Sequence, residues 1–333
     1  MIMKRIGLVA STNGLGHARR LLHLGLGFTE LGFNPVLFAS RRQLALLKSE
    51  INELKNNAFF EFIEIAQHGI EGPAWASSGY EIRVPDQDVI HKIKNCNLII
   101  SDNVIWPFNY NQAFVLFGHF NWLNYWSQMG IKYFPPRTVD TFKEEVDLIE
   151  KIQIAFQFKS FTMGSERYAP KKILRMSLLR YQTDALFPKS NGKNVTIWIA
   201  KGTTGLDQNI LSERNLDKKI VFKELETYQL IKSKSKPSII LGRPGLGTIR
   251  DCLASGTPFL PIISNLDTEL QSNVENLKKM SLYQGDTSNN NKDFESNIFA
   301  MLKNDFLIDL WSSVWPNVSE KNSHIAASII ANS

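Results

Sequence analysis

The stretch GRPGLGTIRDCLASG, residues 242–256, follows a short apolar run and contains a glycine-rich turn, a helix start and a carboxylate. The apolar run predicts a buried strand, and Thr248 is expected to begin the helix. Gly245 and Gly247 would let backbone amides approach a ligand closely, and exposed amides at a helix start attract phosphate. Asp251 lies about one helical turn beyond Thr248, where it could accept hydrogen bonds from a sugar. The stretch therefore predicts a nucleotide site, and an ordinary strand, turn and helix with a solvated Asp251 is the alternative.

The composition indicates a globular protein with two domains. At 333 residues the chain is longer than a typical single domain, and a hydrophobic content of 43% supports two cores. The two cysteines, Cys96 and Cys252, give neither a disulfide framework nor a zinc spacing, which favours a reducing compartment such as the cytoplasm. The apolar run near the N-terminus is too short for a signal peptide or a membrane span. The net charge of +6 suits phosphate-bearing ligands or an anionic membrane surface, but Lys and Arg are scattered, so charge does not select a partner.

Alternating apolar runs and helical patterns predict two parallel α/β domains. In the first half, expected strands and helices alternate at 5–11, 18–31, 35–40 and 41–54, and further strands are expected at 59–65, 97–102 and 113–120. The composition at 183–194 is typical of a connector, after which the strand pattern starts again. We therefore predict an α/β fold of two doubly wound, Rossmann-like domains, 1–186 and 187–333, with a final helix at 323–330 that could pack back on the first domain.

A second glycine-rich turn, NGLGHARR at 13–20, follows the first expected strand. Gly14 and Gly16 occupy two positions of a dinucleotide fingerprint, but Arg19 stands at the third and no acidic residue ends the second expected strand. An NAD site is therefore not predicted. His17 lies at a helix start and at the carboxyl edge of a parallel sheet, where such folds bind ligands. Because the positive end of a helix favours a neutral imidazole, His17 is a candidate general base, and a capping or packing role is the alternative.

Asp102 ends an apolar run at the same predicted sheet edge and could orient a histidine base, as a carboxylate does in catalytic triads. An Asx turn would also place an aspartate there. His119 follows the next expected strand and is a rival for the base. An aromatic-rich region predicts either core packing or stacking against a sugar or a lipid interface. It contains Trp106, Pro107, Phe108, Tyr110, Phe120, Trp122, Tyr125, Trp126, Tyr133 and Phe134.

Two doubly wound domains, a histidine on the first turn and a nucleotide turn with a downstream carboxylate together resemble the GT-B glycosyltransferases, whose two domains face a cleft. The second domain is most similar to that of the lipid-linked N-acetylglucosaminyltransferase family of peptidoglycan synthesis. The residues in register with the nucleotide segment of that family are Gly245, Thr248, Asp251, Ala254, Gly256 and Pro258. The resemblance implies that Asp251 binds the uridine ribose, where the family usually has a glutamate.

The resemblance also implies the other donor contacts. The donor nucleotide would contact Gly202, Thr203, Arg243, Gly245, Leu246, Gly247, Thr248 and Asp251. Arg243 could neutralise the departing diphosphate, a task that GT-B enzymes perform with helix amides and basic residues instead of a metal. The donor sugar would contact Asp267, Glu269 and Gln271. These residues precede Asn273, and Leu270 stands where the family usually has a glutamine.

On the acceptor side, Gly14 and Gly16 resemble the first loop of the family, and His17 with Asp102 resembles the histidine and aspartate pair of small-molecule glycosyltransferases. The implied function is inverting transfer of a hexosyl or N-acetylhexosaminyl group from a nucleotide diphosphate sugar, most simply a UDP sugar, to an acceptor hydroxyl. A nucleotide-sugar hydrolase of the same fold, like the one in pseudaminic acid synthesis, and an inactive nucleotide-sugar-binding protein are the alternatives. A dehydrogenase is the weakest rival, because neither glycine turn carries the full fingerprint.

The same resemblance sets expectations for cofactors, partners and location. No cofactor and no metal are expected, since GT-B enzymes stabilise the departing diphosphate with helix amides and basic residues. The partners would be a nucleotide sugar and an acceptor that is a cell-envelope or other glycan, a lipid-linked sugar or a small molecule, with no nucleic acid. A cytoplasmic location is expected, with peripheral contact to the inner face of the plasma membrane as an option.

Overall fold

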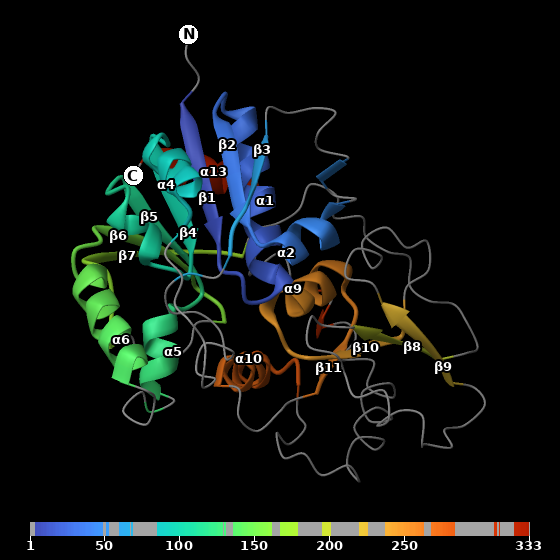
Figure 1. The fold of residues 1–333 in the computed structure, drawn as a ribbon. Helices are drawn as coiled ribbons and strands as arrows, with labels where there is room; N and C mark the ends of the chain where they lie inside the picture. The colour runs from blue at the N-terminus through green and yellow to red at the C-terminus, as the bar shows by residue number, and fades with distance from the viewer. Residues whose placement is uncertain are drawn as a thin grey trace. The chain divides into compact units, whose positions relative to one another are not determined.

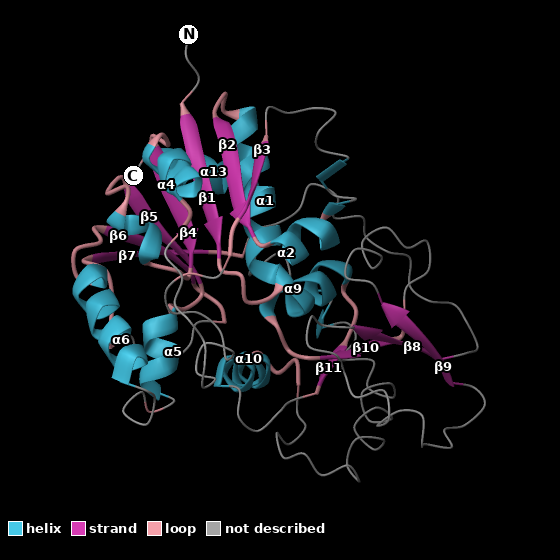
Figure 2. Ribbon diagram, in the orientation of Figure 1, coloured by secondary structure: helices cyan, strands magenta, loops and turns pink. Residues whose placement is uncertain are grey.

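The computed structural model divides into two compact units (Figure 1). The first unit comprises Met1–Leu179 and Glu320–Ser333, and the second comprises Arg180–Ser319. Each unit contains a parallel sheet with helices packed on it, which confirms the predicted α/β fold class (Figure 2). The residues that the structure describes are 4–48, 51–52, 60–66, 68, 85–128, 130, 136–161, 167–178, 195–200, 220–225, 237–262, 268–283, 310–311, 313 and 323–332.

The described strands of the first unit form one parallel sheet in the order β3-β2-β1-β4-β5-β6-β7. They are β1 (Arg5–Ala10), β2 (Asn34–Ala39), β3 (Glu61–Glu64), β4 (Leu98–Asp102), β5 (Phe114–Gly118), β6 (Ile154–Phe158) and β7 (Lys172–Met176). β1 lies between β2 and β4, so the order of strands reverses direction there. In open α/β sheets, ligands bind outside the carboxyl ends of the strands at such a switch point. The ends of β1 and β4 are therefore where a site is expected.

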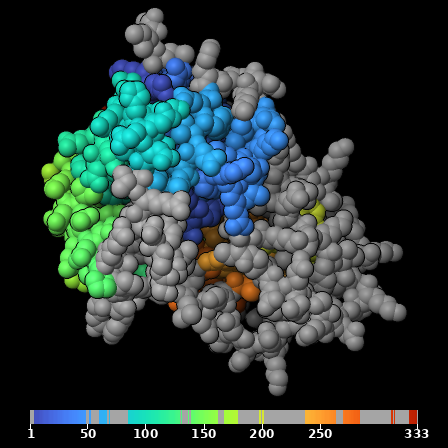
Figure 3. Space-filling view, in the orientation of Figure 1, coloured from blue at the N-terminus to red at the C-terminus, as the bar shows by residue number. Residues whose placement is uncertain are grey.

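Helices surround this sheet. They are α1 (Leu15–Glu30), α2 (Arg41–Leu46), α4 (Gln87–Lys94), the 3-10 helix η2 (Trp106–Asn109), α5 (Trp122–Gln128), α6 (Pro136–Ile149) and the final helix α13 (Ser323–Ala331). α13 packs against α1 and belongs to the first unit. Figure 3 shows α4 and α6 at the surface of this unit. Across the described part of the chain, every helix is too short or too polar to span a bilayer.

The core of the first unit is rich in aromatic residues. β4 and β5 are buried along almost their whole length, as expected for parallel strands that are covered on both faces. Most of the described part of the aromatic-rich region belongs to the same core cluster, with Tyr110 packed against it. Its core members are Trp106, Phe108, Phe120, Trp122, Tyr125 and Trp126. These side chains therefore pack in the core, and Tyr133 and Phe134 lie outside the described residues.

The described strands of the second unit form a parallel sheet in the order β11-β10-β8-β9. They are β8 (Val195–Ala200), β9 (Ile220–Leu225), β10 (Ile239–Gly242) and β11 (Phe259–Pro261), and the described helices on this sheet include α9 (Leu246–Ser255) and α10 (Thr268–Lys279). The predicted start of α9 at Thr248 is wrong, because the helix begins at Leu246. Gly245 has the extended conformation of an N-cap residue, so helical geometry starts directly after it. Gly247 therefore lies in the first helical turn.

Candidate active site

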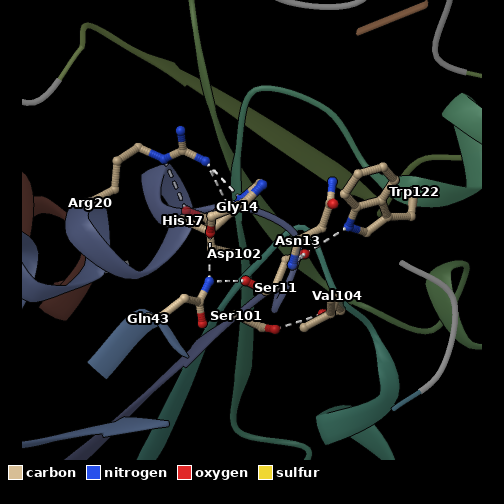
Figure 4. Close-up of polar contacts among 10 residues, drawn as sticks. All are labelled: Ser11, Asn13, Gly14, His17, Arg20, Gln43, Ser101, Asp102, Val104 and Trp122. Carbon is tan, nitrogen blue, oxygen red and sulfur yellow. Dashed lines mark hydrogen bonds and ion pairs between the residues drawn. The ribbon is translucent and has the colours of Figure 1, made fainter. Parts of the chain in front are cut away.

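His17 and Asp102 meet at the switch point of the first sheet. Ala10 at the end of β1 pairs in register with Asp102 at the end of β4, so the turn after β1 starts beside Asp102. Gly14 ends that turn as the N-cap of α1 with a φ of 90°, a conformation that side chains other than glycine rarely adopt. His17 follows in the first turn of the helix, after Gly16, and its Nδ1 lies 2.9 Å from Oδ1 of Asp102. The two residues predicted as a catalytic pair are thus in contact (Figure 4).

Arg20 joins this pair one helical turn after His17. Its Nε donates to Oδ2 of Asp102 at 3.0 Å, and its Nη2 donates to Oδ1 at 2.9 Å, so the guanidinium grips the carboxylate with two hydrogen bonds. Nη2 also lies 3.0 Å from Nδ1 of His17. The sequence analysis missed Arg20. Its spacing of three residues from His17 was the available signal, because such residues share a helix face.

The electrostatics of the group are dominated by the buried carboxylate. Asp102 is fully buried, and burial alone would raise the pKa of its carboxyl. The charges and hydrogen bonds of Arg20 and His17 outweigh this effect and lower the pKa of Asp102 to about 2. Asp102 is therefore a carboxylate throughout the neutral pH range, and it can accept a hydrogen bond from the imidazole ring.

The turn between β1 and α1 is held from outside by Gln43. Its Nε2 donates to the carbonyl of Ser11 at 2.7 Å and to the carbonyl of Gly14 at 2.6 Å, so one amide closes both ends of the turn. Gln43 is itself fixed by Ser40, which caps α2 in a capping box. Trp122 donates from Nε1 to Oγ of Ser11 at 3.2 Å. The sequence analysis missed these contacts. Gln43 donates to backbone carbonyls, which every residue has, so no residue pattern marks its partners.

Gly118 at the end of β5 leaves room for the end of β4. It has a φ of 137°, and a Cβ at this position would overlap the side chain of Asn103 and approach Oδ1 of Asp102 to 3.0 Å. His119, the rival candidate base, follows Gly118 and is buried, with its ring edge-on to Phe120 at 4.6 Å between centroids. Phe120 in turn lies 6.5 Å from the ring of His17. Both histidines are near the same sheet edge, and the contact with Asp102 favours His17 as the base.

In the second unit, β10 leads into the predicted phosphate turn. Arg243 and Pro244 follow the strand, Gly245 is the N-cap, and Leu246, Gly247 and Thr248 form the first turn of α9. Asn273 of α10 is fully buried, and its Nδ2 donates to the carbonyl of Pro244 at 2.9 Å. The first amides of a helix have no partner within the helix, so this end of α9 can accept an anion. Leu246 is buried, and the other side chains of this first turn are partly exposed.

Asp251 is buried in the second turn of α9, with 3% of its surface exposed. Its Oδ1 lies 3.3 Å from Nη2 of Arg250, which is buried as well. Burial and then the charge of Asp251 raise the pKa of the Cys252 thiol well above its ordinary value. The solvated carboxylate of the alternative interpretation is therefore wrong, because Asp251 is buried. Whether Asp251 binds ribose stays a prediction.

The predicted donor-sugar residues lie partly on α10. Glu269 and Gln271 are partly exposed, whereas Leu270 between them is buried. Leu270 therefore packs into the unit, and its two neighbours are the polar side chains available at this position. Asp267, Gly202 and Thr203 lie outside the described residues.

Comparison with known proteins identifies the fold. Neither a protein-family model nor a curated protein sequence matches the chain. Solved structures do match along the whole chain. The glycotransferase of kitacinnamycin has a TM-score of 0.63 at 11% sequence identity, with coverage of 100% of this chain and 99% of the other. Acinetobacter baumannii MurG has a TM-score of 0.59 at 11% identity, with full coverage of both chains. Phytolacca americana UGT2, complexed with UDP-2fluoro-glucose and pterostilbene, has a TM-score of 0.64 at 10% identity, also with full coverage of both chains.

The chain has the GT-B fold. This result confirms the fold that was predicted from the two glycine-rich turns. At 10–11% identity the likeness concerns the fold alone, so the chemistry of this GT-B chain has to be argued from its own residues. The first unit offers a buried imidazole that is oriented by a carboxylate, which is suited to accepting a proton. The second unit offers a helix start that is suited to binding an anion.

Proposed function

We propose that this protein is an inverting glycosyltransferase that moves a sugar from a nucleotide diphosphate sugar, most simply a UDP sugar, to an acceptor hydroxyl. The contact between His17 and Asp102 at the switch point of the first sheet carries this proposal. The GT-B fold supports it, and UGT2 of the same fold was solved with UDP-2fluoro-glucose. The acceptor would be a glycan, a lipid-linked sugar or a small molecule bound on the side of the first unit.

In the proposed step, the acceptor oxygen attacks the anomeric carbon while its proton passes to Nε2 of His17. The bond between the anomeric carbon and the phosphate oxygen breaks, and the nucleoside diphosphate leaves with the electron pair. Asp102 stabilises the imidazolium that forms, because it is already ionised and accepts a hydrogen bond from Nδ1. A single displacement of this kind inverts the configuration of the anomeric carbon.

The second unit would stabilise the leaving group. Negative charge develops on the diphosphate as the bond to the anomeric carbon breaks, and the first amides of α9 would stabilise it. Arg243 would add a positive charge beside the turn, which would make a metal ion unnecessary. Asp251 would bind the ribose hydroxyls, and Glu269 with Gln271 would contact the transferred hexose or N-acetylhexosamine.

A glycine at 245 provides a sharp test of the nucleotide site. Gly245 has a φ of −68° and a ψ of 142°, and a Cβ there would meet no atom within 4 Å, so the fold does not require glycine at this position. A diphosphate that approaches the backbone closely would require a glycine at position 245, because a Cβ would stand in its way. In Gly245→Ala, we therefore expect an unchanged melting temperature without ligand and a reduced thermal shift with the cognate nucleotide.

The first experiment is a thermal-shift panel with UDP, GDP, TDP, CMP and NAD, followed by activity assays with sugars of the nucleotide that binds. A ligand at about 100 times its dissociation constant stabilises the native state by about 2.7 kcal/mol. His17→Ala should lower turnover about 10²- to 10⁴-fold with little change in nucleotide binding. Full turnover in this variant would exclude His17 as the base. Free sugar released without an acceptor would indicate a hydrolase, and nucleotide binding without turnover of any donor would indicate a binding protein.

A further inference from the structure

Arg20 completes a buried group of one carboxylate, one guanidinium and one imidazole. The side chains of His17, Arg20 and Asp102 are 6%, 4% and 0% exposed. The guanidinium is a permanent cation, whereas an imidazole can gain or lose its charge near neutral pH. Asp102 therefore faces one partner whose charge is fixed and one whose charge is variable.

The contacts favour one tautomer of His17. Oδ1 of Asp102 lies 2.9 Å from Nδ1, so an unprotonated Nδ1 would place two acceptors against each other. Nη2 of Arg20 lies 3.0 Å from the same Nδ1, but Nη2 already donates to Oδ1 and Nε to Oδ2, so Arg20 has its acceptors without the imidazole. A proton on Nδ1, donated to Asp102, satisfies the carboxylate. Nε2 then carries the lone pair that a general base requires.

The surroundings of His17 contribute no further charge in the contacts that the structure describes. Asp102 faces it from β4, and Arg20 from its own helix. The rings of Phe120 and Trp122 face it from the segment after β5, at 6.5 Å and 6.3 Å between centroids. His119 is a titratable residue as well, and its ring packs against Phe120. Among the described contacts of Asp102, Arg20 is the permanent cation and His17 is the group whose charge can change.

A buried carboxylate that loses its counter-charge is unfavourable, and protonation is the simplest relief. Without Arg20, the nearest group that could supply a positive charge to Asp102 is His17, as an imidazolium. An imidazolium has no lone pair and cannot accept the proton of an acceptor hydroxyl. We propose that Arg20 is a positioning residue that holds the charge of Asp102 and thereby keeps His17 neutral, with its proton on Nδ1. The role in catalysis rests on the proposed function of His17 as the base.

Nitrogen-15 NMR of the histidine rings in the full chain tests this proposal without any substrate. The chain has six histidines, and the His17 signal is assigned by its loss in His17→Gln. At pH 7.5, wild type and Arg20→Lys should show a neutral ring with the proton on Nδ1. Arg20→Met should show an imidazolium that releases its proton at a higher pH than the wild-type ring, because the cation beside Nδ1 is gone. The acid limb of the pH profile of kcat/KM should move in the same direction.

Two control variants separate the charge of Arg20 from other effects. Arg175→Met removes a positive charge that contacts Gln157 on β6, and the His17 signal should stay as in wild type. Arg20→Met combined with Asp102→Asn removes both charges, and His17 should return to the neutral form. A neutral ring in Arg20→Met alone would overturn the proposal.

The experiment also distinguishes this proposal from the proposed function. If Arg20→Met does not fold, the wild-type signal decides, because an imidazolium or a proton on Nε2 at pH 7.5 would overturn the proposal. A neutral ring with its proton on Nδ1 in both wild type and Arg20→Lys would support it. Failure to transfer sugar from any donor would count against the proposed function, and the NMR result on the buried group would stand.

Discussion

Replacing Asp102 by Asn should lower the free energy of unfolding, and the loss should become smaller as the pH falls below 5. Asp102 is fully buried, and its pKa is lowered from 3.8 to about 2. A carboxyl whose pKa is lower in the folded protein stabilises the fold above the unfolded value, and this contribution is lost as the pH falls through the folded value. The shift corresponds to about 2 kcal/mol above pH 5, about 1 kcal/mol at pH 3 and almost nothing by pH 1.

The assay is urea unfolding of wild type and Asp102→Asn at pH 5 and at pH 3, followed by tryptophan fluorescence. The variant should be less stable at both values, since breaking a buried ion pair costs about 3–5 kcal/mol. The difference in unfolding free energy should narrow by about 1 kcal/mol from pH 5 to pH 3. Asp88→Asn is the control, because the side chain of Asp88 is 75% exposed and should show no such narrowing. A difference that is the same at both pH values would refute the electrostatic reasoning.

Three further substitutions test the support of the two sites. Gly118→Ala should lower stability by about 1–3 kcal/mol and reduce turnover, because its Cβ would overlap Asn103 beside Asp102. Gly32→Ala, also at positive φ but in open space, measures the backbone cost alone, and equal losses in the two variants would contradict the steric argument. Gln43→Leu should leave the carbonyls of Ser11 and Gly14 without their shared donor and lower the free energy of unfolding by about 1–3 kcal/mol. Amide exchange in the turn should become faster, and an unchanged exchange rate would argue against the role of Gln43. Asn273→Ala should weaken nucleotide binding by releasing the carbonyl of Pro244, as measured by the thermal shift, and an undiminished shift would show that the turn holds its shape without this bond.

The sheet of the first unit could be predicted from the sequence where apolar runs end in polar residues. β1, β2, β4 and β5 all have this pattern, and their carboxyl ends meet at one edge in the structure. β6 and β7 were not predicted. Gln157 interrupts the apolar run of β6, and β7 carries Lys172 and Arg175 at the edge of the described sheet. Pairing with neighbouring strands, which no local pattern records, defines them as part of the sheet.

The candidate site was predicted in part, for a related reason. His17 and Asp102 each follow a strand that is visible in the sequence, so sheet topology brings them together. Arg20 was not assigned, although it lies one helical turn after His17, because no local pattern shows that its side chain turns toward Asp102. The burial of Asp251 was not foreseen either, since it depends on how α9 packs. Local sequence predicts which residues reach a sheet edge, and packing determines which of them pair.

The buried group of His17, Arg20 and Asp102 is itself an argument for function. A buried ion pair contributes little net stability, and apolar residues of similar volume often serve a fold as well or better. The first unit already has a core rich in aromatic residues, so its stability does not require a carboxylate beside this sheet edge. The group lies at the switch point where α/β folds bind ligands, and it includes an imidazole that can exchange protons near neutral pH. A role in proton transfer would account for the position, the burial and the chemistry of these three residues together.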